Sequence, residues 1–142
     1  MANDADRLVQ EATAILKSDA RVAVQKLDEA WTLVQAAGGA GAAIVAEELS
    51  RAWARRKGWA RALHWARRAT LVAPERKAAW AALGKTCELV ALKTDRPGHA
   101  RRTVALHRAT ATAFKRAAAL ATDREDKNWL LELARDAAQR TK

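Results

Sequence analysis

Basic side chains at helical spacing are the residues of this chain best suited to chemistry, and that chemistry is the binding of acidic groups. The basic ridge consists of Arg61 and Arg68 on one expected helix, and of Arg101, Arg108, Lys115 and Arg116 on another. Arg101, Arg108 and Lys115 recur every seven residues, so on a helix they project within about 40° of one another. Such a surface can hold carboxylates or phosphates.

Residues that catalyse reactions or hold metals do not form a recognisable set. His64, His99 and His107 lack the spacing of metal ligands, and His107 falls on the apolar side of its expected helix, where buried histidines are common. Cys87 is expected to be a small buried residue. The glycines at 38–41 lack the lysine of a phosphate-binding loop. We therefore expect no enzyme, no metal and no cofactor.

The charge of the chain is concentrated in its middle. The net charge is +10, and residues 51–116 hold seventeen Lys/Arg against three Asp/Glu, whereas residues 1–50 hold four against eight. A field of this kind attracts acidic partners and speeds their association. An acidic protein or peptide is the expected partner. Nucleic acid is the alternative, although no helix-turn-helix, zinc-finger or RNA-recognition signature accompanies the charges.

The composition favours helices and a reducing compartment. Half of the residues are apolar, with alanine in excess, and Gly and Pro together number eight. The single cysteine cannot form an intramolecular disulfide. The first residues carry acids instead of a basic leader, and no long apolar run occurs. We expect a soluble, cytoplasmic protein of one all-α domain, with no membrane span.

Apolar residues at three- and four-residue spacing predict about seven helices. They are expected at about 4–17, 20–36, 43–56, 59–72, 77–93 and 99–121, with a last helix that starts at a capping box over 122–125 and runs to about Arg140. Asp4 or Asp6 is expected to cap the first helix, and Asp19 the second. The glycine-rich stretch at 36–43 is expected to be a loose joint.

The pattern of residues 43–76 begins again at Lys77, after 34 residues. The first copy contains Leu49, Trp53, Ala62, Leu63, Ala66, Ala69 and Pro74, and the second opens with Trp80, Leu83 and Gly84. This pattern resembles the tetratricopeptide repeat (TPR). The resemblance implies a helical-hairpin solenoid: a degenerate repeat at 4–42, a regular one at 43–76, an extended one at 77–124 and a C-terminal capping helix at 125–142. The residues of this last helix that would cover the open end of the stack are Trp129, Leu130, Leu133, Ala134 and Ala137.

The resemblance also implies a function. The first helices of TPR hairpins line a concave groove, into which Glu47, Arg51, Arg55, Lys85 and Glu88 would point. Most tryptophans are expected to pack inside the fold, with Trp65 nearer the polar edge and better placed for a contact. We therefore expect a non-catalytic adaptor, scaffold or assembly factor. Self-association through the extended hairpin is a further expectation.

Overall fold

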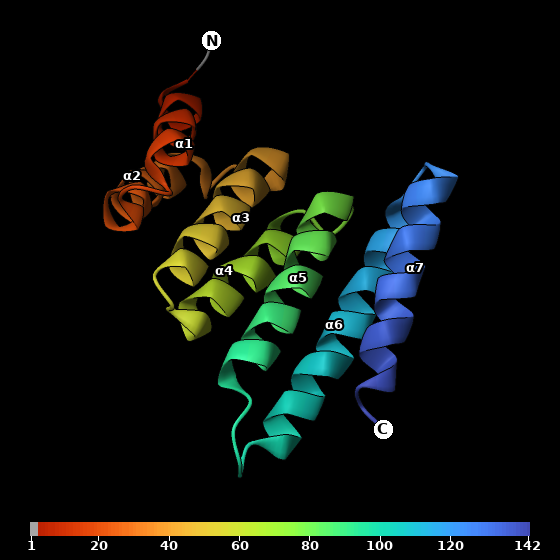
Figure 1. The fold of residues 1–142 in the computed structure, drawn as a ribbon. Helices are drawn as coiled ribbons and strands as arrows, with labels where there is room; N and C mark the ends of the chain where they lie inside the picture. The colour runs from red at the N-terminus through yellow and green to blue at the C-terminus, as the bar shows by residue number, and fades with distance from the viewer. Residues whose placement is uncertain (1–2) are drawn as a thin grey trace. The chain divides into compact units, whose positions relative to one another are not determined.

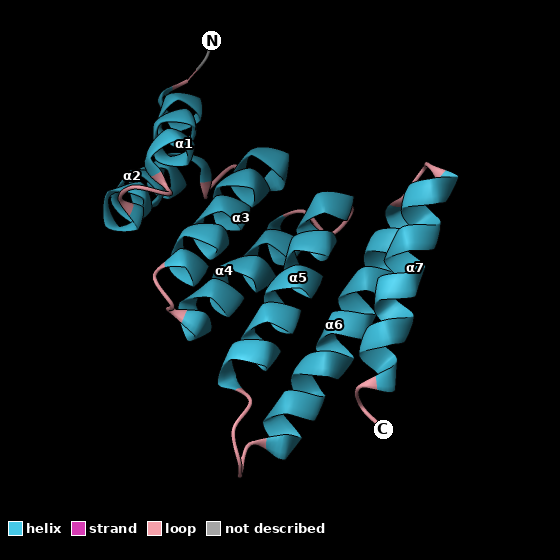
Figure 2. Ribbon diagram, in the orientation of Figure 1, coloured by secondary structure: helices cyan, strands magenta, loops and turns pink. Residues whose placement is uncertain are grey.

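The structure is a computed structural model that describes residues 3–142, and in that range it contains seven helices and no strand (Figures 1 and 2). The helices are α1 (Asp4–Ile15), α2 (Ala20–Val34), α3 (Gly39–Arg55), α4 (Trp59–Val72), α5 (Lys77–Thr94), α6 (Ala100–Leu120) and α7 (Arg124–Gln139). The expected all-α class and the order of the helices are confirmed. The chain divides into two compact units, the first ending at Pro74 and the second beginning at Glu75.

Three helices begin after a side chain that caps a backbone N–H: Asn3 before α1, Asp19 before α2 and Asp123 before α7. The prediction of Asp19 is confirmed, since its carboxylate accepts a hydrogen bond from the Val22 N–H at 3.1 Å. The predicted cap at Asp4 or Asp6 is wrong. Both lie inside α1, because the Asn3 amide oxygen accepts from the Asp6 N–H at 2.8 Å and starts the helix earlier.

The glycine-rich joint is shorter than expected. α3 begins at Gly39, four residues before the predicted start at Ala43. Within this stretch Gly38 and Gly39 take positive φ, at 63° and 71°, and make the bend, since residues with a side chain rarely adopt such angles. Ala42 and Ala43 are completely buried, so packing favours the helix over this stretch despite its glycines.

The first unit, through Pro74, contains α1 to α4. Each helix packs against the next along the chain, and α1 also touches α3. Its core is built largely from alanines with no exposed surface, including Ala46, Ala62 and Ala66, around Leu27 and Leu49. Small side chains let the helix axes approach closely. One buried hydrogen bond joins α3 to α4, from the Ser50 hydroxyl to the Ala62 carbonyl at 2.8 Å.

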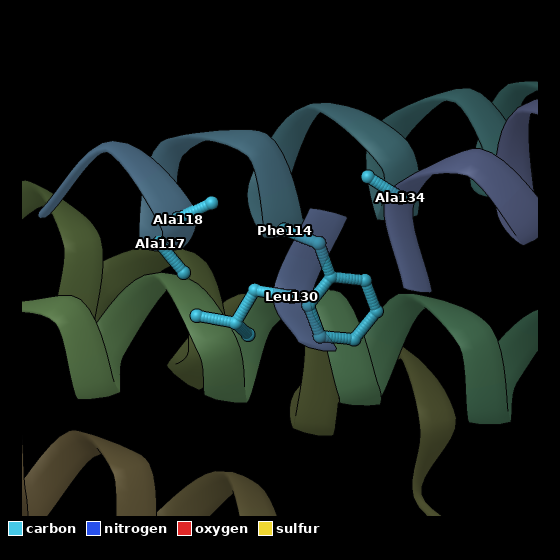
Figure 3. Packing of buried hydrophobic residues seen from close by; sticks show 5 residues of the cluster. All are labelled: Phe114, Ala117, Ala118, Leu130 and Ala134. Carbon is cyan, nitrogen blue, oxygen red and sulfur yellow. The ribbon is translucent and has the colours of Figure 1, made fainter. Parts of the chain in front are cut away.

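The second unit, from Glu75, contains α5, α6 and α7, with α6 packed against both of the others. Its core holds Phe114, Ala117 and Ala118 of α6 with Leu130 and Ala134 of α7 (Figure 3). Of the α7 residues expected to cover the open end of the stack, Leu130, Ala134 and Ala137 are buried, whereas Trp129 is 50% exposed. One residue further along a helix means a turn of about 100°, and this rotation places Trp129 outside the buried face.

Ion pairs fasten α7 to α5 at both ends of the second unit. The Lys77 ammonium pairs with the Asp126 carboxylate near the start of α7. Just beyond the end of α7, the Arg140 guanidinium lies 3.3 Å from the Glu88 carboxylate. These side chains are partly or largely exposed, so each pair contributes roughly 0–1 kcal/mol. The pairs fix the register of α7 more than they add stability.

Candidate functional site

The first unit carries a basic surface on α3, α4 and the turn between them. From Arg51 to Pro74 the chain contains no acidic residue and seven basic ones: Arg51, Arg55, Arg56, Lys57, Arg61, Arg67 and Arg68. All seven side chains are exposed. Because α3 and α4 run side by side as one hairpin (Figure 1), these charges gather on one small unit of the molecule. We call this set the hairpin surface.

The turn of this hairpin is built around Trp53. The Cζ atoms of Arg56 and Arg61 lie 4.5 and 4.4 Å from the centroid of its ring. Gly58 makes room for the ring, since a Cβ at Gly58 would lie 2.8 Å from the Trp53 Cε3 atom. Lys57 takes φ 62°, an unfavourable angle for a residue with a side chain. The turn therefore wraps onto the tryptophan and holds two arginines against it, in a cation–π arrangement worth about 0.5–1 kcal/mol per exposed pair.

A second aromatic group joins α2 to α4. Trp31, 9% exposed, meets Trp65 edge to face, with ring centroids 5.0 Å apart and planes at 77°. His64 lies edge-on to Trp65 at 5.2 Å. The Arg68 guanidinium lies 5.8 Å from the Trp31 ring centroid. Trp65, which the sequence analysis placed best for a partner contact, is thus half-buried and contacts Trp31 and His64 of its own unit. Arg68, about one helical turn further along α4, is exposed.

Two acidic residues of the first unit lie close to the hairpin surface. The Glu48 carboxylate is 2.8 Å from the Arg51 guanidinium. Asp28 of α2 is near Arg61, yet loss of surrounding water raises the pKa of its carboxyl above the ordinary value, and the attraction of Arg61 only partly opposes this. These two carboxyl groups lie near Arg51 and Arg61, two of the seven basic residues. Within residues 3–142, the structure gives Arg55, Arg56 and Arg68 no carboxylate within ion-pair distance.

The residues predicted to line a groove fall in both units. Glu47, Arg51 and Arg55 lie on α3 of the first unit, at four-residue spacing that places them along one side of the helix. Lys85 and Glu88 lie on α5 of the second unit. Glu88 is engaged by Arg140, as described above, while Lys85 is exposed. The structure therefore brings the first three together on one helix and the last two on another.

The predicted basic ridge is likewise divided between helices. Arg61 and Arg68 belong to α4 and so to the hairpin surface. Arg101, Arg108, Lys115 and Arg116 are all exposed on α6, and Arg116 lies over Trp80 with its Cζ 5.3 Å from the ring centroid. A hollow of about 410 Å³ lies along α6, lined by Ala100, Arg101, Val104 and Arg108.

Sequence reasoning missed one feature of the second unit. A hollow of about 340 Å³ is lined by Glu88, Ala91, Leu92, Asp95, Thr103, His107 and Arg140. His107 is half-buried, and its Nδ1 atom is buried with no hydrogen-bond partner among the described residues. This histidine, expected to be buried from its place on the apolar side of the helix, is thus found with one ring nitrogen left without a hydrogen bond in the part of the chain that the structure describes. The position of His107 on the apolar side of α6 was the one signal for this hollow in the sequence, because the other lining residues come from separate parts of the chain.

Other predictions concern chemistry and membranes. Cys87 is completely buried, as expected. No group of three or more His, Cys, Asp or Glu side chains able to hold a metal ion occurs in residues 3–142. None of the helices described in that range has the length and apolar character that a membrane crossing requires.

Comparisons with known proteins identify no relative from which a function could be inferred. No protein-family model matches the sequence, and no curated protein resembles it at a significant level.

Proposed function

We propose that this protein is a non-catalytic interaction module, an adaptor or assembly factor that binds an acidic protein or peptide. The observation that carries the proposal is the hairpin surface, where exposed arginines rest on tryptophan rings and no acidic residue interrupts the sequence from Arg51 to Pro74. An arginine already held by a ring loses less side-chain freedom when it binds. Its planar fork is suited to carboxylates, which it can grip with two parallel hydrogen bonds.

The same contacts favour a protein partner over nucleic acid. Proteins that bind single strands without sequence preference stack bases on open aromatic faces. Trp53 has two guanidinium groups against it, and Trp31 is almost fully buried beside Trp65. Little of the face of these two rings remains for a base to stack on. Nucleic acid is kept as the second candidate because α6 carries five basic residues and no acidic one.

We also propose that the helices form a TPR-like array, with α1–α2 and α3–α4 as successive hairpins in the first unit. The packing of each helix on the next, the contact of α1 with α3 and the 34-residue pattern support this arrangement. On this proposal Glu47, Arg51 and Arg55 of α3 face the groove of the array. A cytoplasmic location fits the single buried cysteine.

The test is a pair of titrations at physiological ionic strength, followed by fluorescence anisotropy. One probe is a glutamate-rich peptide and the other is an oligonucleotide of similar net charge. The protein variant carries Arg56→Glu, Arg61→Glu and Arg68→Glu. The control carries two reversals, Lys17→Glu and Arg21→Glu, at exposed residues of the first unit outside the hairpin surface. Exposed charge pairs contribute about 0.2–1 kcal/mol each, so the triple reversal should weaken peptide binding by about tenfold or more.

The outcomes separate the two candidates. The proposal expects tighter binding of the peptide than of the oligonucleotide, lost in the triple variant and kept in the control. Tighter binding of the oligonucleotide, with an affinity that falls steeply with salt, would favour the second candidate. An Arg51→Glu, Arg55→Glu variant tests the groove separately: unchanged peptide binding would remove α3 from the site.

A further inference from the structure

The exposed face of α6 has a regular composition that the hairpin surface lacks. Six exposed residues follow one another at spacings of four and three along this helix: Arg101, Ala105, Arg108, Thr112, Lys115 and Ala119. Every second member is basic, and the members between are small, two alanines and a threonine. Other sides of α6 pack against α5 and α7 and hold buried residues such as Thr110 and Phe114, while Arg102 and Arg116 are exposed outside this series. We call the six residues the α6 stripe.

The three cations of the α6 stripe are separated by seven residues each, which is about two turns of an α-helix. Seven residues of α-helix rise about 10.5 Å, so Arg101, Arg108 and Lys115 lie along a line about 21 Å long. The screening length at physiological salt is about 8 Å, which means that each cation acts largely on its own nearest partner. Within residues 3–142, the structure gives these three side chains no carboxylate within ion-pair distance.

The surface between the cations is low and largely apolar. The hollow of about 410 Å³ is lined by the Arg101 and Arg108 side chains and also by Ala100 and Val104. Small side chains at 105, 112 and 119 keep the helix surface low between the charges. The Thr112 side chain adds a methyl group and one hydroxyl, which is able to donate a hydrogen bond to a partner carboxylate. Such a surface lets a second helix approach to the axis separation of about 8–10 Å that packed helices share.

We propose that the α6 stripe docks an amphipathic helix of a partner protein that carries acidic side chains every seven residues and apolar side chains between them. A helix returns to the same face every seven residues with the same rise of about 10.5 Å, so its acids meet the three cations in register. An extended strand repeats on one face about every 6.8 Å, so it can meet Arg101 and Lys115 together but not Arg108 between them. A DNA strand carries a phosphate about every 3.4 Å of axis and offers no preference for this spacing.

This inference rests on the proposed binding of acidic protein segments and adds the form of the segment. The probe is a synthetic helical peptide of about 21 residues with glutamate at every seventh position, leucine four positions after each glutamate and alanine or glutamine elsewhere. The comparison peptide has the same composition, but its glutamates are moved to different sides of the helix. We expect the matched peptide to bind at least about tenfold more tightly than the comparison peptide.

Charge reversal on the full chain tests the contact from the protein side. Arg108→Glu with Lys115→Glu should weaken the matched peptide about tenfold or more, because two of the three cations are replaced by acids. The hairpin-surface variant should leave the affinity for this peptide within about twofold.

Substitution of Thr112 is the sharper test. Thr112→Arg adds positive charge but raises the surface between the cations. If the peptide helix packs on the α6 stripe, this variant should bind the matched peptide roughly fivefold more weakly. If only electrostatic attraction holds the peptide, the variant should bind it more tightly. Thr112→Ala is the matched control: it keeps the surface low, and we expect its affinity to stay within about twofold of the parent.

Circular dichroism of each variant checks that helix content is retained, since Arg108, Thr112 and Lys115 are exposed positions of α6. Equal binding of the two peptides, or tighter binding by Thr112→Arg, overturns the helix inference. If one of these results is found while the hairpin-surface variant still abolishes binding of a disordered glutamate-rich peptide, the inference fails and the proposed function stands. If no acidic peptide of either kind binds, both fail.

Discussion

Gly84 of α5 provides the most direct test of the packing of the second unit. A Cβ placed on Gly84 would lie 2.8 Å from the Cε1 atom of Phe114 and 2.9 Å from its Cδ1 and Cζ atoms. Phe114 is completely buried against Leu130 and the alanines of α6 and α7, so the ring has nowhere to move. Overpacking of this kind costs typically about 1–3 kcal/mol, and three contacts below 3.0 Å place Gly84→Ala in the upper part, about 2–3 kcal/mol.

Helix propensity works in the opposite direction, since alanine is favoured over glycine inside a helix by about 0.5–1 kcal/mol. The free energy of unfolding should therefore fall by about 1–2 kcal/mol in Gly84→Ala. Urea titration followed by circular dichroism measures this change from the midpoint at constant slope. Gly41→Ala is the matched control: Gly41 lies in α3 with nothing within 4 Å of an added Cβ, so the same substitution should be stabilising there.

A double substitution tests the cause of the destabilisation. Phe114→Leu shortens the side chain that meets the new methyl group, so adding it to Gly84→Ala should cost about 1 kcal/mol less than the sum of the single changes. A Gly84→Ala protein as stable as the parent, or a double variant that is simply additive, would refute the close packing of α5 on α6.

Three further predictions concern the first unit. Lys57→Gly should raise the free energy of unfolding by about 1 kcal/mol, because it removes the side chain from a residue held at φ 62°; an unchanged urea midpoint would contradict this. Ser50→Ala should lower it by about 1 kcal/mol through loss of the buried hydrogen bond to the Ala62 carbonyl, whereas an exposed control, Ser18→Ala, should change it far less. Hydrogen bonding to Lys26 lowers the pKa of the Glu11 carboxyl below 4.5. The pair therefore stabilises the fold at pH values above 4.5, and this contribution is lost as the pH falls through the lowered pKa. In urea titrations Glu11→Gln should be less stable than the parent near pH 7 and equally stable in strong acid.

Helix positions could be predicted where the chain carries clear stop signals. α4 begins and ends at its predicted residues, because Gly58 and Pro74 bound it on either side. The start of α3 could not be predicted in the same way. Glycines at 38–41 signal a break, and only the burial of Ala42 and Ala43 in the folded unit shows why the helix continues through Gly41.

The candidate site was predictable in its charges and not in its contacts. Alternation of basic and apolar residues placed Arg61, Arg68 and Arg108 on exposed sides of helices, and the structure agrees. The partner of Arg68, however, is Trp31, which lies far away along the chain and comes near only when α2 and α4 are folded together. Spacing along one helix carries no information on such cross-helix pairs.

The central claim, that the hairpin surface binds an acidic protein, is tested most directly by affinity capture from native lysate, with and without nuclease. The parent chain is compared with the variant carrying Arg56→Glu, Arg61→Glu and Arg68→Glu and with the Lys17→Glu, Arg21→Glu control. The account predicts an acidic protein that survives nuclease, is retained by the control and is lost from the triple variant. Capture that disappears with nuclease, or that the triple variant retains in full, would contradict it.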